Sequence, residues 1–262
     1  VVADKLFPTV GNWSAAQQTA SIVNFGQDSS FAGNKTAQGN QDDNGIGDFY
    51  YAPPAGFLAL CTKNLPEPTV VPSEHFNAVL WTGTTSVDRD ITGIGFDPSL
   101  VWIKSRSDAY EQLWFDKVRG AGKRLTSHNT NAESTNDSTL NAFITDGFTL
   151  GNGSTVDLSV NGNTSKTYVA WNWKANGAGV SNTDGSITST VSANVDAGFS
   201  IVSWTGDRSG TSKSVGHGLS QTVEMVIYKD RGAVTDWRVA HHSLSANKQL
   251  ALNGTSAEFT QS

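Results

Sequence analysis

Short runs of β-forming residues, each ended by a glycine or asparagine turn, cover most of the chain. Alternation is clearest in residues 167–173, TYVAWNW, where Tyr168 and Ala170 fall on one face of an extended strand and Trp171 and Trp173 on the other. We find no long stripe of apolar residues at the 3.6-residue spacing of an amphipathic helix. The pattern therefore predicts an all-β fold made of short antiparallel strands joined by tight turns.

One eight-residue pattern occurs twice, 123 positions apart (199 − 76 = 123), as FNAVLWTG at residues 76–83 and FSIVSWTG at residues 199–206. Three further pairs of segments match in the same order: 91–96 with 214–219, 100–106 with 225–231, and 120–125 with 245–250. Self-similarity over such a length indicates a duplicated structural unit. We predict that the matched segments are strands, that 100–106 and 225–231 are buried, and that Trp81 and its counterpart Trp204 pack inside the two copies.

The duplication sets the predicted boundaries of two β-sandwich modules. We assign residues 76–176 to the first module and residues 177–262, a linker plus a partial repeat, to the second. Residues 186–194, SITSTVSAN, alternate and are predicted to form an edge strand that opens the second module. The second copy has no counterpart of residues 143–175, so we expect the second module to be incomplete.

Composition and charge narrow the class of protein. Gly is abundant and only 16% of the residues are charged, which suits a turn-rich β protein. The net charge of −6 argues against non-specific nucleic-acid binding, which needs clustered Lys and Arg. No apolar run approaches the roughly 20 residues of a membrane span. The lone Cys61 lies in the apolar run GFLALC, so we expect a small buried residue rather than a reactive thiol.

The first part of the chain differs from the repeat and resembles a known family. IVNFGQ at residues 22–27 and FYYAPPAGFLALCTKNLPEP at residues 49–68 resemble the closing strand and exit of a SPRY-type, concanavalin-like β-sandwich. The segments from FNAVLWTG to TYVAWNWKANGAGVSNTDGSITSTVSAN resemble modules that follow such a sandwich in large virion proteins of tailed bacteriophages, especially marine ones. The resemblance implies that residues 1–66 are the C-terminal part of a lectin-like sandwich and residues 67–75 a proline-containing linker. About the last third of the sandwich is present, so we expect a longer chain or partner chains to complete it.

The resemblance also implies a function. The protein would be a non-enzymatic structural component on the outside of a phage particle, most directly a tail fibre or appendage that binds host-surface polysaccharide. A capsid decoration or head-fibre protein is the alternative, and a polysaccharide depolymerase is a third. Its partners would be other copies of itself and other virion proteins, with no cofactor, nucleic-acid partner or membrane insertion.

An acidic segment, NQDDNGIGD, is the first candidate site. Its members Asp42, Asp43, Asn44 and Asp48 offer the oxygen ligands that Ca²⁺ prefers. Their spacing does not fit an EF-hand loop, so an ordinary acidic turn is the favoured interpretation and a cation site the alternative.

Two tryptophans form the second candidate site. Trp114 and Trp237 each lie near charged residues after a loop and could stack on a sugar ring, although their equivalence in the repeat favours a shared structural role. The adjacent His241 and His242 have no further residue at a zinc-ligand spacing and are expected to face solvent. No nucleophile elbow or assignable pair of carboxylates occurs, so no catalytic residue is proposed.

Overall fold

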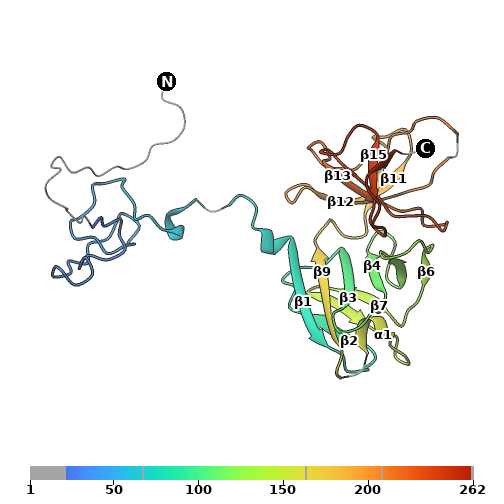
Figure 1. Cartoon of the computed structure of the whole chain (residues 1–262), viewed down its shortest axis with the longest axis horizontal. Helices are drawn as coiled ribbons and strands as arrows, with labels where there is room; N and C mark the ends of the chain where they lie inside the picture. The colour runs from blue at the N-terminus through green and yellow to red at the C-terminus, as the bar shows by residue number, and fades with distance from the viewer. Residues whose placement is uncertain (1–21, 67, 163, 208, 261–262) are drawn as a thin grey trace. The chain divides into compact units, whose positions relative to one another are not determined.

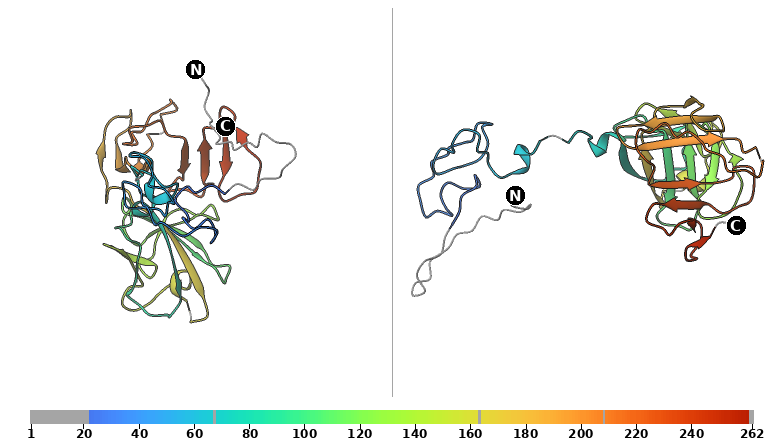
Figure 2. Two further views of the ribbon diagram at one scale, coloured as in Figure 1. Left: turned by 90° about the vertical axis from the view of Figure 1, so that its left-hand side faces the viewer. Right: turned by 90° about the horizontal axis from the view of Figure 1, so that it is seen from above.

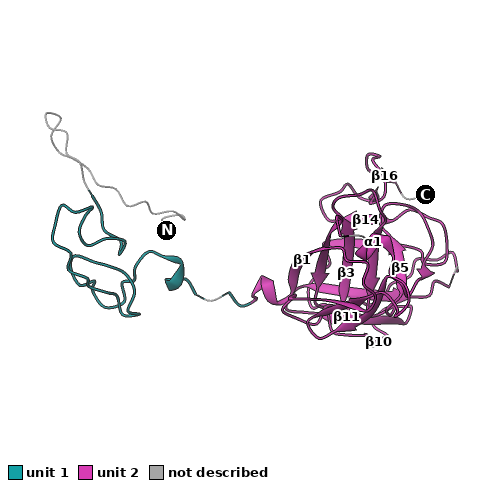
Figure 3. Ribbon diagram, turned by 90° about the horizontal axis from the view of Figure 1, so that it is seen from below, with its two compact units in different colours: residues 1–69 teal, residues 70–262 magenta. Residues whose placement is uncertain are grey.

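The computed structural model describes residues 22–66, 68–162, 164–207 and 209–260. The chain divides into two compact units, residues 1–69 and residues 70–262 (Figure 3). The fold is all-β, as predicted: antiparallel strands dominate, and α1 (Leu158–Asn161), the one α-helix among the described residues, is four residues long (Figure 1). No helix in the described part of the chain is long and apolar enough to cross a membrane.

Turns rather than a sheet hold the described residues of the first unit. Its regular elements there are an isolated antiparallel bridge between Asn40 and Phe49 and the 3-10 turn η1 (Thr62–Asn64). Ala59 is 4% exposed, but its neighbour Cys61 is exposed, so the expectation of a buried cysteine is wrong. Within residues 22–66, no sheet is present to bury the apolar run around this cysteine.

The segment 22–27, which the resemblance implies is a closing strand, is not a strand. Asn24 donates side-chain hydrogen bonds to the carbonyl oxygens of Asp28 and Asp48. Gly26 adopts a φ of +98°, a left-handed conformation that glycine allows and a regular strand does not. The chain therefore turns at this point instead of extending.

The first half of the second unit is a two-layered antiparallel sandwich, entered through the 3-10 turn η2 (Pro72–Glu74). Its strands are β1 (Phe76–Thr82), β2 (Arg89–Thr92), β3 (Leu100–Ser105), β4 (Gln112–Asp116), β5 (Lys123–Thr126), β6 (Ser134–Thr135), β7 (Leu140–Ile144), β8 (Gly147–Leu150) and β9 (Thr167–Trp173). One sheet has the order β1-β9-β3-β4-β5-β6 and the other β2-β8-β7. The late strand β9 therefore lies between β1 and β3, and it is antiparallel to both (Figure 1).

The hydrophobic core of this half lies between its two sheets. Val101 of β3, Phe115 of β4 and Phe148 of β8 are fully buried in it. Tyr168 and Ala170 of β9 join them, as the alternation of that segment predicted. The opposite face of the six-stranded sheet is consequently free to meet the rest of the unit.

Two smaller antiparallel sheets make up the second half. Their strands are β10 (Val180–Asn182), β11 (Ser189–Asn194), β12 (Phe199–Trp204), β13 (Met225–Tyr228), β14 (Arg238–His241), β15 (Lys248–Ala251) and β16 (Phe259–Thr260). The orders are β10-β11-β12 and β13-β14-β15-β16, and both sheets lie over the first half (Figure 2, right). The segment predicted as an edge strand, β11, is the middle strand of its sheet, because both neighbouring hairpin strands pair with it.

The duplication is visible in the strand pairing. β3 pairs with β4, and β13 with β14, in the same register after a shift of 125 positions, as in Leu100 to Met225. In the next pair of strands Trp114 lies opposite Leu125, and Val239 lies opposite Leu250 (239 − 114 = 250 − 125 = 125). Trp114 therefore corresponds to Val239, and its predicted equivalence to Trp237 is wrong by two residues.

Strands of the second half are more exposed than their counterparts in the first. Trp81 is 7% exposed, whereas its counterpart Trp204 is 43% exposed. Val101 is fully buried, whereas its counterpart Val226 is 43% exposed. The predictions that Trp204 and the segment 225–231 are buried are therefore wrong, because no described strands cover this half as the sheet β2-β8-β7 covers the first.

Candidate functional site

A row of indole rings occupies the face of the six-stranded sheet that points away from its core. Trp102 lies opposite Trp171 on one side and opposite Trp114 on the other, and directly opposed residues share a face of the sheet. The ring centroids are 5.2 Å apart in both pairs. Trp237 of the second half extends this indole row, with its ring centroid 5.0 Å from that of Trp114. The row is thus where the two halves of the unit meet.

The two tryptophans singled out from the sequence, Trp114 and Trp237, pack against each other. Trp237 is 3% exposed, and its Nε1–H donates a 2.8 Å hydrogen bond to the carbonyl oxygen of Thr126. Trp114 is half-buried. Because Trp237 has almost no solvent-facing surface, its ring is a packing element between the two halves rather than an open platform for a sugar.

An ionic cluster makes a second link between the halves. The Glu133 carboxylate accepts hydrogen bonds from Arg231 at 2.9 Å through each oxygen and from Arg119 at 3.1 Å. Burial by itself would raise the pKa of the Glu133 carboxyl, but the bonds and charges of Arg231 and Arg119 outweigh burial and hold that pKa below its ordinary value. Arg231 also donates to the Ser203 hydroxyl of β12 at 3.0 Å. The Arg231 guanidinium, which follows β13, therefore bonds both to β12 and to Glu133 of the first half.

A shallow groove of about 300 Å³ opens beside the indole row, and we call it the Trp102 groove. The residues that line it are Trp102, Gln112, Ser127, His128, Leu252, Asn253, Gly254 and Thr255. The Nε1–H of Trp102 is buried and has no hydrogen-bond partner among the described residues. The groove thus combines an indole with two amides, two hydroxyls and an imidazole, and none of its lining residues is a carboxylate.

Hydrogen bonds hold the polar walls of the Trp102 groove in place. The backbone N–H of Gln112 donates to His128 Nδ1 at 3.3 Å, and the side-chain oxygen of Gln112 accepts from the Ser127 hydroxyl at 3.4 Å. On the facing wall, Asn253 Oδ1 accepts from the backbone N–H of Trp237 at 2.8 Å. Both walls are therefore anchored to strands or to the indole row, which keeps their polar groups in position without a ligand.

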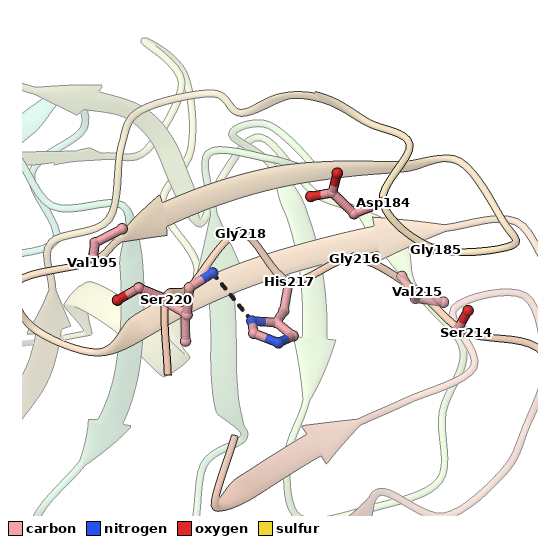
Figure 4. A pocket seen from close by; sticks show the side chains of 10 residues that line it. Asp184, Gly185, Val195, Ser214, Val215, Gly216, His217, Gly218 and Ser220 are labelled. Carbon is pink, nitrogen blue, oxygen red and sulfur yellow. Dashed lines mark hydrogen bonds between the residues drawn. The ribbon is translucent and has the colours of Figure 1, made fainter. Parts of the chain in front are cut away.

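A second hollow, of about 510 Å³, lies in the second half of the unit (Figure 4). It is lined by Asp184, Gly185, Val195 and residues 214–220. His217 accepts the backbone N–H of Leu219 on Nδ1 at 3.1 Å, as in a tight turn. Asp184 is the one carboxylate among the lining residues, and glycoside cleavage commonly needs two.

The candidate cation ligands of the first unit are used inside their own turns. The Asp42 carboxylate accepts from the backbone N–H groups of Asn44, Ile46 and Ala59 and from Asn64 Nδ2, at 2.7 to 2.9 Å. Burial raises the pKa of Asp42, yet these four bonds outweigh it and the net pKa lies below the ordinary value. This carboxylate organises the loop, as a buried anion with four donors does.

The other predicted ligands behave in a similar way. The carboxylates of Asp43 and Asp48 each accept a backbone N–H, at 2.7 and 3.0 Å. His241 and His242 are exposed, as expected, with ring centroids 4.5 Å apart. Across the described ranges, no three His, Cys, Asp or Glu residues gather in a way that could hold a metal ion.

The second unit corresponds to a recognised family. A family model described as "Domain of unknown function (DUF7483)" matches residues 71–262, which is 192 of the 262 residues (262 − 71 + 1 = 192). The chain belongs to the DUF7483 family. No curated protein and no solved structure matches it. The DUF7483 match begins one residue after the start of the second unit, so both halves of that unit fall within it.

The groove of this DUF7483 chain was not expected from the sequence. Asn253-Gly254 is a recognisable turn signal, and it could have located one wall. Trp102 lies in the segment 100–106, which was predicted to be buried, and the pattern of that segment does not indicate that its indole lines a groove. The meeting of these two segments depends on how the halves pack, which local patterning does not encode.

Proposed function

We propose that this protein is a non-enzymatic structural and adhesive component of a bacteriophage virion, a tail-fibre or appendage subunit that binds host-surface glycan through the Trp102 groove. The Trp102 groove carries the binding part of the proposal, since it joins an indole to amides, hydroxyls and an imidazole without a carboxylate. The virion location rests on the resemblance of the sequence to tailed-phage structural proteins.

The chemistry of the groove suits a sugar ring. An indole offers an apolar surface to the C–H groups of a pyranose, while amides and hydroxyls satisfy its hydroxyl groups. A groove this shallow is expected to bind weakly, and repetition of the subunit in a fibre would convert weak sites into firm attachment through avidity.

The binding part can be tested with immobilised bacterial surface polysaccharides and the full chain. Replacement of His128 by Ala, or of Thr255 by Arg, should weaken retention about tenfold, equivalent to roughly 1.4 kcal/mol, because both side chains are exposed at the groove. His242→Ala is the matched control, since this imidazole is exposed and lies outside the groove. Equal retention of all four proteins, or of none, would exclude the groove as the glycan site.

The virion part can be tested by imaging. Gold-labelled antibody against the second unit should mark an appendage of the intact particle. A regular lattice of label over the capsid would instead favour the decoration or head-fibre alternative. Release of new reducing ends from polysaccharide would favour a depolymerase, an outcome that the carboxylate-free Trp102 groove does not predict.

A further inference from the structure

Five asparagines of this chain are followed directly by glycine: Asn44, Asn152, Asn161, Asn176 and Asn253. In an Asn-Gly pair the backbone nitrogen of the glycine can attack the side-chain amide of the asparagine, because glycine has no side chain to hinder the approach. The attack needs an amide side chain that can turn toward that nitrogen, and an N–H that no acceptor holds. These two requirements separate the five pairs.

Three of the pairs are held at both reacting groups. In the pairs that begin at Asn44, Asn161 and Asn253, the glycine N–H donates to an oxygen of its own unit at 2.6 to 3.2 Å. The side-chain Nδ2 of each of these asparagines also donates a hydrogen bond, at 2.8 to 3.0 Å. Asn161 is fully buried in addition. In these pairs the folded chain therefore opposes the attack at the nucleophile and at the amide.

The fourth pair, Asn152-Gly153, is held at its side chain. Asn152 Oδ1 accepts from the backbone N–H groups of Ser154 and Thr155, at 3.3 and 3.0 Å, and from the Thr155 hydroxyl at 3.2 Å. Such bonds from an asparagine side chain to the backbone just after it are typical of tight turns. A side chain that turns toward the Gly153 nitrogen must give them up, so the amide of Asn152 is restrained although the residue is exposed.

The fifth pair, Asn176-Gly177, is held at neither group. It lies in the connection from β9 to β10, and Asn176 is exposed. Within the described ranges, the amide side chain of Asn176 has no hydrogen-bond partner and the N–H of Gly177 has no acceptor. A Cβ placed on Gly177 would meet no atom within 4 Å, so the space beside this peptide bond is open. Both requirements of the attack are met at this pair.

We infer that Asn176 is a site of spontaneous deamidation, and that it reacts faster than the other four Asn-Gly sites. The Gly177 backbone nitrogen loses its proton and forms a bond to the Cγ of Asn176. The bond between Cγ and Nδ2 breaks, and the departing nitrogen takes up a proton and leaves as ammonia. Water then opens the succinimide ring at either of its carbonyl carbons, which gives aspartate or isoaspartate at position 176. Either product adds one carboxylate to the surface.

The two products act differently on the connection between the halves. Ser192 of β11 is fully buried, and its hydroxyl accepts the N–H of Asn176 and donates to the carbonyl oxygen of Gly177, both at 2.8 Å. Isoaspartate routes the chain through Cβ and so adds one backbone atom between these two groups, which strains the pair of bonds to Ser192. Aspartate leaves the backbone and both bonds as they are. Isoaspartate therefore loosens this connection, whereas aspartate changes only its charge.

The experiment incubates the full chain in mildly alkaline buffer and follows all five sites by peptide mass mapping. Asn176 should convert about tenfold faster than each of the other four asparagines, a factor that corresponds to about 1.4 kcal/mol of activation free energy. The same chain unfolded in urea is the matched control: the five sites should then react at similar rates, because the contacts that distinguish them are gone. Equal rates in the folded chain, or a faster conversion at any of the other four sites, overturns the proposal.

A second arm detects the isoaspartate product with an isoaspartate-specific methyltransferase. Labelling of the aged wild-type chain should fall in the peptide that contains position 176. Asn176→Gln keeps the amide and the charge but lengthens the side chain by one methylene, so ring closure is disfavoured and most of the labelling should disappear. Full labelling of aged Asn176→Gln would refute the assignment. For the effect on Ser192, the backbone amide at position 176 should lose hydrogen-exchange protection in the isoaspartate form and keep it in Asn176→Asp; equal protection in both would refute the strain assigned to isoaspartate.

Discussion

The hydroxyl of Tyr168 provides the sharpest test of the core, because one oxygen atom bonds two backbone groups, one of them buried. It accepts the backbone N–H of Gly162 at 2.6 Å and donates to the carbonyl oxygen of Leu158 at 2.7 Å. Tyr168→Phe keeps the ring in the core and removes both bonds. Leaving the buried N–H of Gly162 without a partner costs about 1–3 kcal/mol, and losing the part-buried bond to Leu158 costs about 0.5–1.5 kcal/mol, so we expect a total loss of about 2–4 kcal/mol of unfolding free energy.

Urea unfolding of the full chain, followed by tryptophan fluorescence, measures this loss. With an m-value of about 2 kcal/mol per molar urea, the midpoint should fall by about 1–2 M while the slope stays unchanged. Tyr228→Phe is the matched control: this half-buried ring belongs to the same unit, and its hydroxyl bonds to no described residue, so its midpoint should move by less than about 0.3 M. Equal shifts for Tyr168→Phe and the control would refute the bonding role assigned to the Tyr168 hydroxyl.

Two further predictions concern the links within the same unit. The pKa of Glu133 lies below its ordinary value in the folded protein, so the contribution of this carboxylate to stability is complete above about pH 4.3 and is lost as the pH falls through the folded-state pKa. Urea midpoints measured from pH 7 to pH 3 should therefore fall less steeply for Glu133→Gln than for the wild type. Parallel curves would contradict the pairing of Glu133 with Arg231. A Cβ on Gly147 would lie 1.9 Å from the backbone oxygen of Ile91, so Gly147→Ala should lower the midpoint by more than 1 M or prevent folding, whereas Gly206→Ala, with nothing within 4 Å, should leave the midpoint unchanged.

Local patterning predicted the strands well because alternation and turn residues act over a few positions. The segment 167–173 was predicted as a strand with Tyr168 and Ala170 on one face, and both are fully buried in the core. The duplication could likewise be inferred from the sequence, since the matched segments follow one another in the same order in both copies. These features depend on residues that are neighbours in the sequence, so the pattern of a single sequence is enough to predict them.

Burial and pairing partners depend on segments that are far away in the sequence, and several predictions of burial and of equivalence were therefore wrong. Trp81 and Trp204 occupy the same place in nearly identical octapeptides, yet the first is covered by the sheet β2-β8-β7 and the second is not covered by described strands. The equivalence of Trp114 and Trp237 also failed, because both sit near a charged loop and the two-residue shift appears only in the ladder register. The Trp102 groove escaped prediction for the same reason: its walls come from different halves.

The contrast between the two halves bears on how each is stabilised. The first half closes its own core because β9 returns to pair with β1 and β3 and places Tyr168 and Ala170 between the sheets. Among the described residues, the second half has no strand in the place of β9, and it contacts the first half through the indole row and through the hydrogen bonds of Arg231 to Glu133. Because β12 and β13 each end their sheet whereas β3 is paired on both sides, the backbone amides of β12 and β13 should on average exchange with solvent faster than those of β3. Hydrogen exchange of the full chain measures this difference, and equal protection of β12, β13 and β3 would contradict the contrast drawn between the two halves.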